Sequence, residues 1–155
     1  MTNDGLLYFE DLIPGRRFGS GTLPVDADAI RRFAAEFDPQ PFHLDDAAAR
    51  GTFFGGLAAS GWRTAALTMR LLVGSDLRPV GGIVGAGMDE LRWPNPVRPS
   101  DELRLESEVL EARPVRSRPE YGLVKAHTTT LNQHAEPVQI LIANLLVPRR
   151  PTAAD

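Results

Sequence analysis

The sequence contains no cysteine, which excludes disulfide bonds, thiolate nucleophiles and cysteine-based metal centres. It also has no surplus of basic residues, because 17 Lys and Arg are set against 20 Asp and Glu, for a formal net charge of -3. A nucleic-acid-binding protein would normally carry a basic face, so we expect no nucleic-acid partner. Lysine itself is almost missing, since Lys125 is the only one in the chain.

Long apolar runs are absent as well. No stretch reaches the ~18 consecutive apolar residues of a membrane-spanning helix. Arg63 and Arg70 interrupt the most apolar segment, 55–73. The first five residues lack the charged-then-apolar order of a secretory signal. We therefore expect a cytoplasmic protein with no membrane partner.

What remains is the composition of one folded domain. The chain has 155 residues, of which 43% are hydrophobic, and a single domain is expected at this length. It shows no internal repeat. The sequence predicts one domain over 1–155, with a core at about 8–147. Its ends, 1–5 and 148–155, are expected to be loose, because Pro148 and Pro151 stop any strand.

The first half of the chain has helical patterns. Asp26 and Asp28 offer N-cap oxygens to a helix that must end near Asp38, because Pro39 and Pro41 cannot continue it. A short strand is expected over 16–23 and a turn over 44–50. Segment 57–73 predicts a second helix that is apolar on most sides, which indicates a helix enclosed by the rest of the fold. Gly74 is expected to cap it in the left-handed conformation.

The second half predicts strands over 83–93, 101–109, 121–131 and 138–147. Polar and apolar residues alternate in the second of these, whereas the last is almost continuously apolar and is expected to be a central strand. Short connections between consecutive strands favour an antiparallel sheet. One buried helix against one such sheet makes an α+β domain.

A carboxylate and an imidazole share one stiffened loop. Pro39 and Pro41 lie between Asp38 and His43. Such a pair can hold a water molecule and move protons to and from it, and histidine titrates near neutral pH. On spacing alone, the simpler interpretation is that Asp38 caps a helix end and His43 fills a niche.

Two further segments and two histidines carry weaker signals. The helix entrance at 55–62 would expose backbone N–H groups to a carbonyl oxygen or an anion, although its small residues also suit helix–sheet packing. Arg113, Arg116 and Arg118 could contact phosphates, although a solvated loop is the simpler interpretation. His127 and His134 have no metal-ligand spacing, and we expect no metal.

Two of these segments resemble a known family. The run Asp38-Pro-Gln-Pro-Phe-His-Leu-Asp45, followed by Phe54-Gly-Gly-Leu-Ala-Ala-Ser-Gly-Trp62, resembles the MaoC-like dehydratases, which include the (R)-specific enoyl-CoA hydratases. The opening segment 8–15 and the loop 93–103 are similar to that family too. The resemblance implies a hotdog fold, in which an antiparallel sheet wraps a long central helix. It also implies a homodimer or higher homo-oligomer, with the acyl-CoA site near the subunit interface and with no metal or redox cofactor.

The implied reaction is reversible hydration of trans-2-enoyl-CoA to (R)-3-hydroxyacyl-CoA, or dehydration of a related hydroxyacyl thioester. The resemblance assigns Asp38 and His43 to activate the water, and Ser60 and Gly61 to bind the thioester as an oxyanion site. A backbone N–H near Gly61 would polarise the thioester oxygen. Many hydratases of this group have Asn where Gln40 stands and His where Ser60 stands, so the lining near the thioester differs here.

Two other functions stay open at this point. A hotdog thioesterase would direct water at the carbonyl carbon, and a non-catalytic accessory subunit would only bind acyl-CoA. The Asp38 and His43 pair favours hydration over both. Four bulky residues surround the motif, and we expect them to belong to the core rather than to an acyl pocket: Phe42, Phe53, Phe54 and Trp62.

Overall fold

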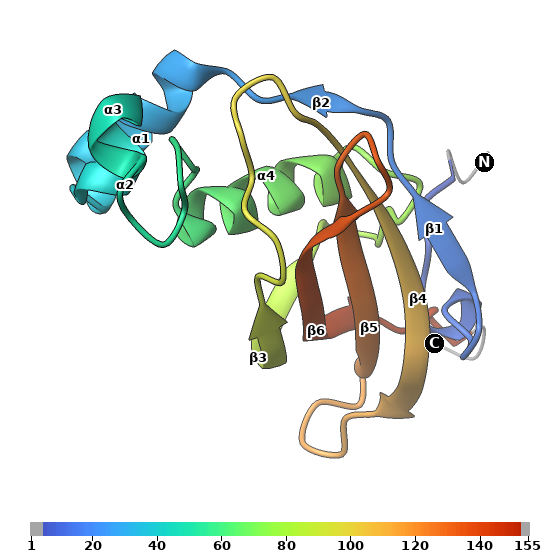
Figure 1. Ribbon diagram of the computed structural model, residues 1–155. Helices are drawn as coiled ribbons and strands as arrows, with labels where there is room; N and C mark the ends of the chain where they lie inside the picture. The colour runs from blue at the N-terminus through green and yellow to red at the C-terminus, as the bar shows by residue number, and fades with distance from the viewer. Residues whose placement is uncertain (1–4, 153–155) are drawn as a thin grey trace.

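The computed structural model describes residues 5–152, which form an antiparallel sheet and a small set of helices (Figure 1). The helical elements are η1 (Phe9–Asp11), α1 (Ala27–Phe37), α2 (Pro41–Leu44), α3 (Asp46–Ala49) and α4 (Gly61–Val73). The strands are β1 (Arg17–Gly19), β2 (Leu23–Pro24), β3 (Val84–Arg92), β4 (Glu102–Pro114), β5 (Tyr121–Leu131) and β6 (Pro137–Pro148). The predicted α+β class is confirmed.

The strands form one sheet in the order β1-β4-β5-β6-β3, and β2 pairs with β4 beside this path. All of these pairings are antiparallel, and β5 and β6 lie in one register from Tyr121 opposite Pro148 to Thr130 opposite Gln139, with a shift before Leu131 opposite Pro137. Strand β6 is an interior strand, as its apolar run predicted. The four long strands agree with the predicted ones to within a few residues, except that β4 continues five residues past Val109.

Helix α4 crosses one face of the sheet, and α1, α2 and α3 gather at its N-terminal end (Figure 1). The helix packs on β4 and β6. Its sheet-facing side carries buried Thr68, whose hydroxyl lies 2.7 Å from the hydroxyl of Thr130 on β5. The apolar core lies on this face of the sheet. Its most buried members include Leu12, Ile30, Leu103, Leu105, Val109, Val138 and Val147.

Three expectations about α4 were wrong. The helix begins at Gly61, and buried residues 57–60 lead into it without regular secondary structure. Gly74 ends it with φ -85° in the right-handed region, because its N–H still bonds to the Arg70 carbonyl. The helix is also not enclosed, since Trp62 and Val73, on the side away from the sheet, are 59% and 61% exposed. The sheet covers only one side of the helix in a single chain.

The segment after α1 is helical where a turn was expected. Pro41 is the first residue of α2, a position where its missing N–H costs no hydrogen bond. Asp45 then caps α3, and its side chain accepts the Ala48 N–H at 2.9 Å. Pro41 therefore begins a helical turn that carries His43, while Gln40 before it is extended, with ψ 147°.

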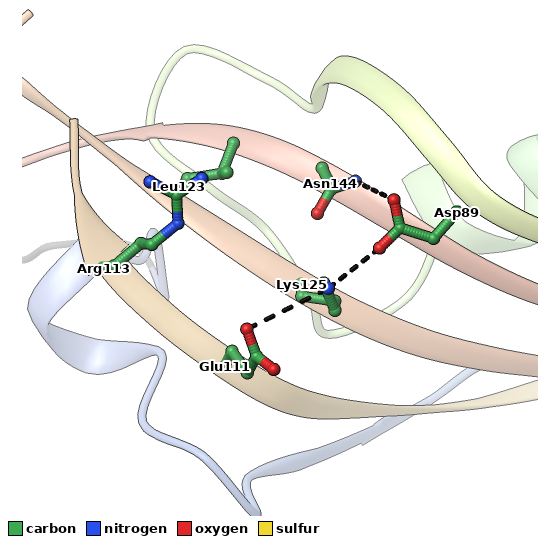
Figure 2. Close-up of a pocket in the computed structure, with 6 residues that line it drawn as sticks. All are labelled: Asp89, Glu111, Arg113, Leu123, Lys125 and Asn144. Carbon is green, nitrogen blue, oxygen red and sulfur yellow. Dashed lines mark hydrogen bonds and ion pairs between the residues drawn. The ribbon is translucent and has the colours of Figure 1, made fainter. Parts of the chain in front are cut away.

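The face of the sheet away from α4 is polar around Lys125, as Figure 2 shows. The Lys125 ammonium lies 2.9 Å from Asp89 and 3.9 Å from Glu111, and Asn144 donates to Asp89 at 3.0 Å. These side chains come from β3, β4, β5 and β6, so charge pairs cross the outer face while the inner face of β5 is buried. This alternation is typical of an antiparallel sheet with one solvated face.

The end of β6 is fixed to the start of the chain. Arg150 contacts both carboxylate oxygens of Asp11, at 2.9 and 2.8 Å, and its N–H donates to Glu10. The expectation of loose chain ends is therefore wrong at Arg150. Residues 1–4 and 153–155, which belong to the same expectation, lie outside the described residues. Within 5–152, none of the helices is long and apolar enough to cross a bilayer.

Candidate active site

Asp38 and His43 lie together, as the motif requires. Asp38 is the C-cap residue of α1 and His43 belongs to α2, so the short Pro-Gln-Pro link between two helices turns the side chains toward each other. His43 Nε2 is 3.3 Å from Asp38 Oδ2, and the two side chains are only 6% and 17% exposed. Both descriptions of Asp38 hold, because it ends a helix and also faces the imidazole.

The tautomer of His43 is set by a backbone carbonyl. Its Nδ1 lies 2.7 Å from the Ala58 oxygen, which can only accept, so Nδ1 carries a proton. Nε2 is then the nitrogen that faces Asp38, and in the neutral ring it has a free lone pair. The buried segment before α4 therefore orients the imidazole for proton transfer at Nε2.

The carboxylate of Asp38 is held ionised by its neighbours. Burial raises the pKa of Asp38. Hydrogen bonds from Gln40 and Ser60, together with the nearby His43, lower it by more, so the pKa lies below its ordinary value. The Gln40 amide donates to Oδ1, which leaves Oδ2 facing His43. An acceptor-only carboxylate is thus placed next to the imidazole.

Ser60 and Gly61 begin helix α4 and differ in exposure. Ser60 is fully buried and is the N-cap, and its Oγ accepts the Trp62 N–H at 3.3 Å. Gly61 lines the cavity described next. Its N–H has no acceptor among the described residues, as is usual in the first turn of a helix. A Cβ at Gly61 would lie 2.6 Å from the Trp93 ring, so close packing also requires glycine here.

A cavity of about 420 Å³ opens beside this pair. Asp38, His43 and Gly61 contribute to its wall, and the remainder is mostly apolar, with Phe42, Phe53, Phe54, Trp62, Trp93, Pro94, Pro96, Val97 and Val138. The expectation that the four bulky residues near the motif are core is wrong for Phe53, which is 96% exposed, and for Trp62. All four line the cavity, so the site combines one polar end with aromatic walls.

This arrangement suits acid–base chemistry on water. The two acceptors Asp38 Oδ2 and His43 Nε2 are close enough for one water molecule to contact both. Residues 5–152 contain no group of three or more His, Asp or Glu side chains that could hold a metal ion. Arg113, Arg116 and Arg118 do not reach this cavity, and Arg113 lies instead at the outer-face cluster around Lys125.

Several residues of the site were missed by the sequence analysis. Gln40 was noted only as a departure from a family pattern, yet it bonds directly to Asp38. The Ala58 carbonyl and the Trp93 ring gave no signal, because a backbone acceptor 15 residues from His43 and a packing partner 32 residues from Gly61 leave no local pattern. Trp93 is fixed by a 2.9 Å hydrogen bond from its Nε1 to Gln139.

Known proteins share this sequence and structure. The MaoC-like domain matches residues 12–131. The crystal structure of a MaoC-like dehydratase from Rhodospirillum rubrum is 57% identical, covers 94% of this chain and 99% of its own, and superposes with a TM-score of 0.90. An unliganded (R)-hydratase from Pseudomonas aeruginosa is 27% identical, covers 97% and 93%, and has a TM-score of 0.73. An uncharacterized protein of Bacillus subtilis (strain 168) is 37% identical over 127 residues, which is 82% of this chain and 89% of that protein.

Proposed function

The chain belongs to the MaoC-like dehydratase and (R)-hydratase family, and from this premise we propose that it hydrates trans-2-enoyl-CoA reversibly to (R)-3-hydroxyacyl-CoA. Dehydration of a related hydroxyacyl thioester is the same reaction in reverse. The hotdog fold implied by the sequence resemblance is confirmed by the match to the Rhodospirillum rubrum dehydratase. The similarity to an (R)-hydratase supports the stereochemistry of the proposed product.

One observation carries the proposal, namely that Asp38 and His43 face each other at 3.3 Å on the wall of a mostly apolar cavity. Hydration of a conjugated thioester needs a water molecule held over the β-carbon and a proton delivered to the α-carbon. In an apolar cavity with a single polar end, the acyl chain would lie against the apolar wall and the water would lie at the polar end. The enoyl group would lie along the aromatic wall, with its double bond over the pair.

His43 is the proton carrier in this scheme. Its Nε2 lone pair takes a proton from water while the water oxygen bonds to the β-carbon and the double-bond electrons move toward the thioester as an enolate. The Nε2 proton then passes to the α-carbon. The sum adds H and OH across the double bond and returns His43 to its starting tautomer, with Nδ1 protonated throughout by its bond to Ala58.

Asp38 orients the water and stabilises the imidazolium. Its lowered pKa makes it a weak base, so it accepts the second water proton as a hydrogen bond and stays negative. At 3.3 Å from Nε2 it favours the positive charge that forms on His43. The N–H of Gly61 is proposed to bind the thioester oxygen, where a donor of this type is worth ~3–4 kcal/mol.

The substrate class and the assembly are parts of the same proposal. Acyl-CoA thioesters are the proposed partners, and the aromatic wall supplies apolar contact for their acyl chains. We also propose a homodimer, which is supported by exposed apolar residues on α4 and on edge strand β3, among them Trp62, Val73 and Met88.

The deciding experiment follows the ultraviolet absorbance of conjugated enoyl-CoAs of short, medium and branched chains, with chiral analysis of the product. The proposal expects loss of the chromophore, an (R)-3-hydroxyacyl product and no free thiol. Thiol release with an intact double bond would identify a thioesterase instead. Binding of acyl-CoA without either reaction would identify an accessory subunit.

A further inference from the structure

We propose that Arg98 is a positioning residue for His43, although it lies outside the motif and does not touch the imidazole. Arg98 holds the chain before Ala58, and the Ala58 carbonyl in turn holds the proton on His43 Nδ1. The inference rests on the proposed function for its effect on catalysis. Its effect on the imidazole can be measured without any substrate.

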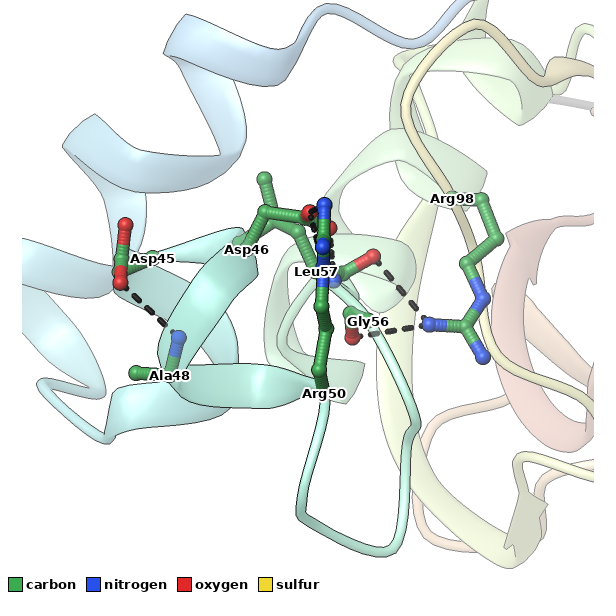
Figure 3. A network of polar contacts seen from close by, with 7 residues as sticks. All are labelled: Asp45, Asp46, Ala48, Arg50, Gly56, Leu57 and Arg98. Carbon is green, nitrogen blue, oxygen red and sulfur yellow. Dashed lines mark hydrogen bonds and ion pairs between the residues drawn. The ribbon is translucent and has the colours of Figure 1, made fainter.

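The Arg98 guanidinium binds backbone carbonyls of the irregular chain between α3 and α4, and Figure 3 shows two of these contacts. Its Nη1 donates to the carbonyl oxygens of Gly56 and Leu57, at 2.9 and 3.3 Å, and its Nη2 donates to the Phe54 carbonyl. This segment has no helix or strand partners for those carbonyls, so one side chain supplies them. A planar guanidinium presents its donors in a fixed fork, which a lysine ammonium cannot reproduce.

The backbone of Arg98 is itself held in place by a hydrogen bond to Asp101. Its backbone N–H donates to Asp101 Oδ2 at 2.8 Å, and Asp101 Oδ1 accepts from Gln133 at 2.9 Å. Asp101 is only 6% exposed, so this anchor is buried. The neighbouring Val97 carbonyl accepts the Ala59 N–H at 2.9 Å, which binds the loop of Arg98 to the segment that contains Ala58.

A second anchor holds the same segment from the side of α3. Asp46 Oδ1 accepts the Leu57 N–H at 3.0 Å, while its Oδ2 accepts from Arg50 (Figure 3). The Leu57 N–H is the main cause of the lowered pKa of Asp46, which keeps this carboxylate ionised and accepting. Leu57 is thus held through its N–H by Asp46 and through its carbonyl by Arg98.

Ala58 follows directly and meets α2 with both of its backbone groups. Its N–H donates to the Phe42 carbonyl at 3.0 Å, and its carbonyl accepts from His43 Nδ1 at 2.7 Å. If the segment moves, Nδ1 loses its acceptor, and a neutral imidazole then places its proton on Nε2 as readily as on Nδ1. Nε2 would have no lone pair for the water in that tautomer, so the proton step would fail while the acyl pocket stays in place.

The test compares Arg98→Ala and Arg98→Lys with Arg104→Ala, an arginine whose side chain pairs with Glu106 on the surface. Two readouts are taken on each protein, namely kcat and KM for an enoyl-CoA, and the ¹⁵N chemical shifts of His43, assigned by comparison with His43→Ala. We expect Arg98→Ala to lower kcat by ~10²-fold with a small change in KM, because misplacement by about 1 Å has that effect. The His43 shifts should move from the Nδ1–H tautomer toward a mixture.

Arg98→Lys should fall between Arg98→Ala and the unchanged protein in both readouts, and Arg104→Ala should match the unchanged protein. Added methylguanidinium should restore part of the kcat of Arg98→Ala and its original shifts. A folded Arg98→Ala protein with unchanged His43 shifts overturns the inference. If Arg98→Ala does not fold, Asp46→Ala replaces it, with the same shift change expected and the same result overturning it.

The shifts also separate this inference from the proposed function. A change of tautomer in Arg98→Ala supports the positioning role even if the unchanged protein does not hydrate any enoyl-CoA. Hydration by the unchanged protein, together with shifts that do not respond to Arg98, supports the proposed function and removes Arg98 from it.

Discussion

His43 Nε2 lies 3.3 Å from Asp38 Oδ2, although five positions and two prolines separate the residues along the chain. The separation is short because α1 ends at Asp38 and α2 begins at Pro41, so the chain reverses within a few residues. A nearly buried carboxylate next to an imidazole would be costly as a purely structural feature. Its place on a cavity wall gives it a chemical use.

The first prediction concerns this pair directly. Asp38→Asn and His43→Ala should each lower kcat for hydration by ~10²–10⁴-fold, the range for loss of a positioned acid–base group. The fold should remain, as judged by circular dichroism. His134→Ala is the matched control, because His134 lies in the turn between β5 and β6. Near-normal activity of either site variant would contradict the assignment.

The second prediction is a pH dependence. The pKa of Asp38 is held below its ordinary value of 3.8, so its carboxylate should stay ionised until the pH falls below 3.8. Gln40→Ala removes a donor to the carboxylate and leaves burial less opposed, so the pKa of Asp38 should rise. The ¹³C chemical shift of the Asp38 carboxyl carbon, followed against pH, measures this on the group itself.

Gln40→Asn is the control for that experiment, because it keeps an amide donor. Its Asp38 titration midpoint should lie closer to that of the unchanged protein. A midpoint that does not move in Gln40→Ala would show that the Gln40 amide does not lower the pKa of Asp38.

The third prediction separates two roles of Ser60. Ser60→Ala removes the N-cap of α4 and should lower the free energy of unfolding by about 1 kcal/mol. It also removes a donor to Asp38, so the pKa of Asp38, followed by the ¹³C chemical shift of its carboxyl carbon, should rise. Asp26→Ala is matched in stability, because Asp26 caps α1 through the Ala29 N–H, and Asp26 is not among the residues that line the cavity. An equal Asp38 titration midpoint in the two variants would leave Ser60 a structural role only.

Much of this arrangement could be predicted from the sequence. Strand β5 was predicted with the bounds it has, because its alternation continues from Tyr121 to Leu131 and turn residues follow. Asp38 and His43 were found because the chemistry of both residue types and the stiff link between them are local features. Such patterns depend only on neighbours in the chain.

Other features could not be predicted, for reasons that are tertiary. Residues 57–60 look helical by composition, but their backbone groups bond to Val97 and Phe42, and this tertiary pairing overrides helix propensity. Trp62 and Val73 look like core by residue type, but the sheet covers only the opposite side of α4. Arg98 has partners 41 to 44 residues away, a distance at which no sequence period operates.

The last prediction concerns the exposed apolar surface of α4 and β3. Strand β3 ends the strand order and pairs only with β6 among the described strands. Val84 and Met88 on this strand are 49% and 57% exposed. Large exposed apolar side chains on a helix and an edge strand often mark an interaction surface, so a second copy of the chain is the expected cover. Sedimentation at micromolar concentration should give the mass of two chains.

Met88→Glu should weaken this association strongly, because a buried unpaired carboxylate costs several kcal/mol and each 1.4 kcal/mol is about tenfold in the dissociation constant. Leu110→Glu is the control, since Leu110 is also exposed, at 39%, but lies on β4 on the other side of β5 and β6. If the cavity needs the partner for its outer wall, activity of Met88→Glu should depend on protein concentration and that of Leu110→Glu should not. A fully active monomer would contradict the dimer, because the exposed faces of α4 and β3 would then have no partner in the working protein.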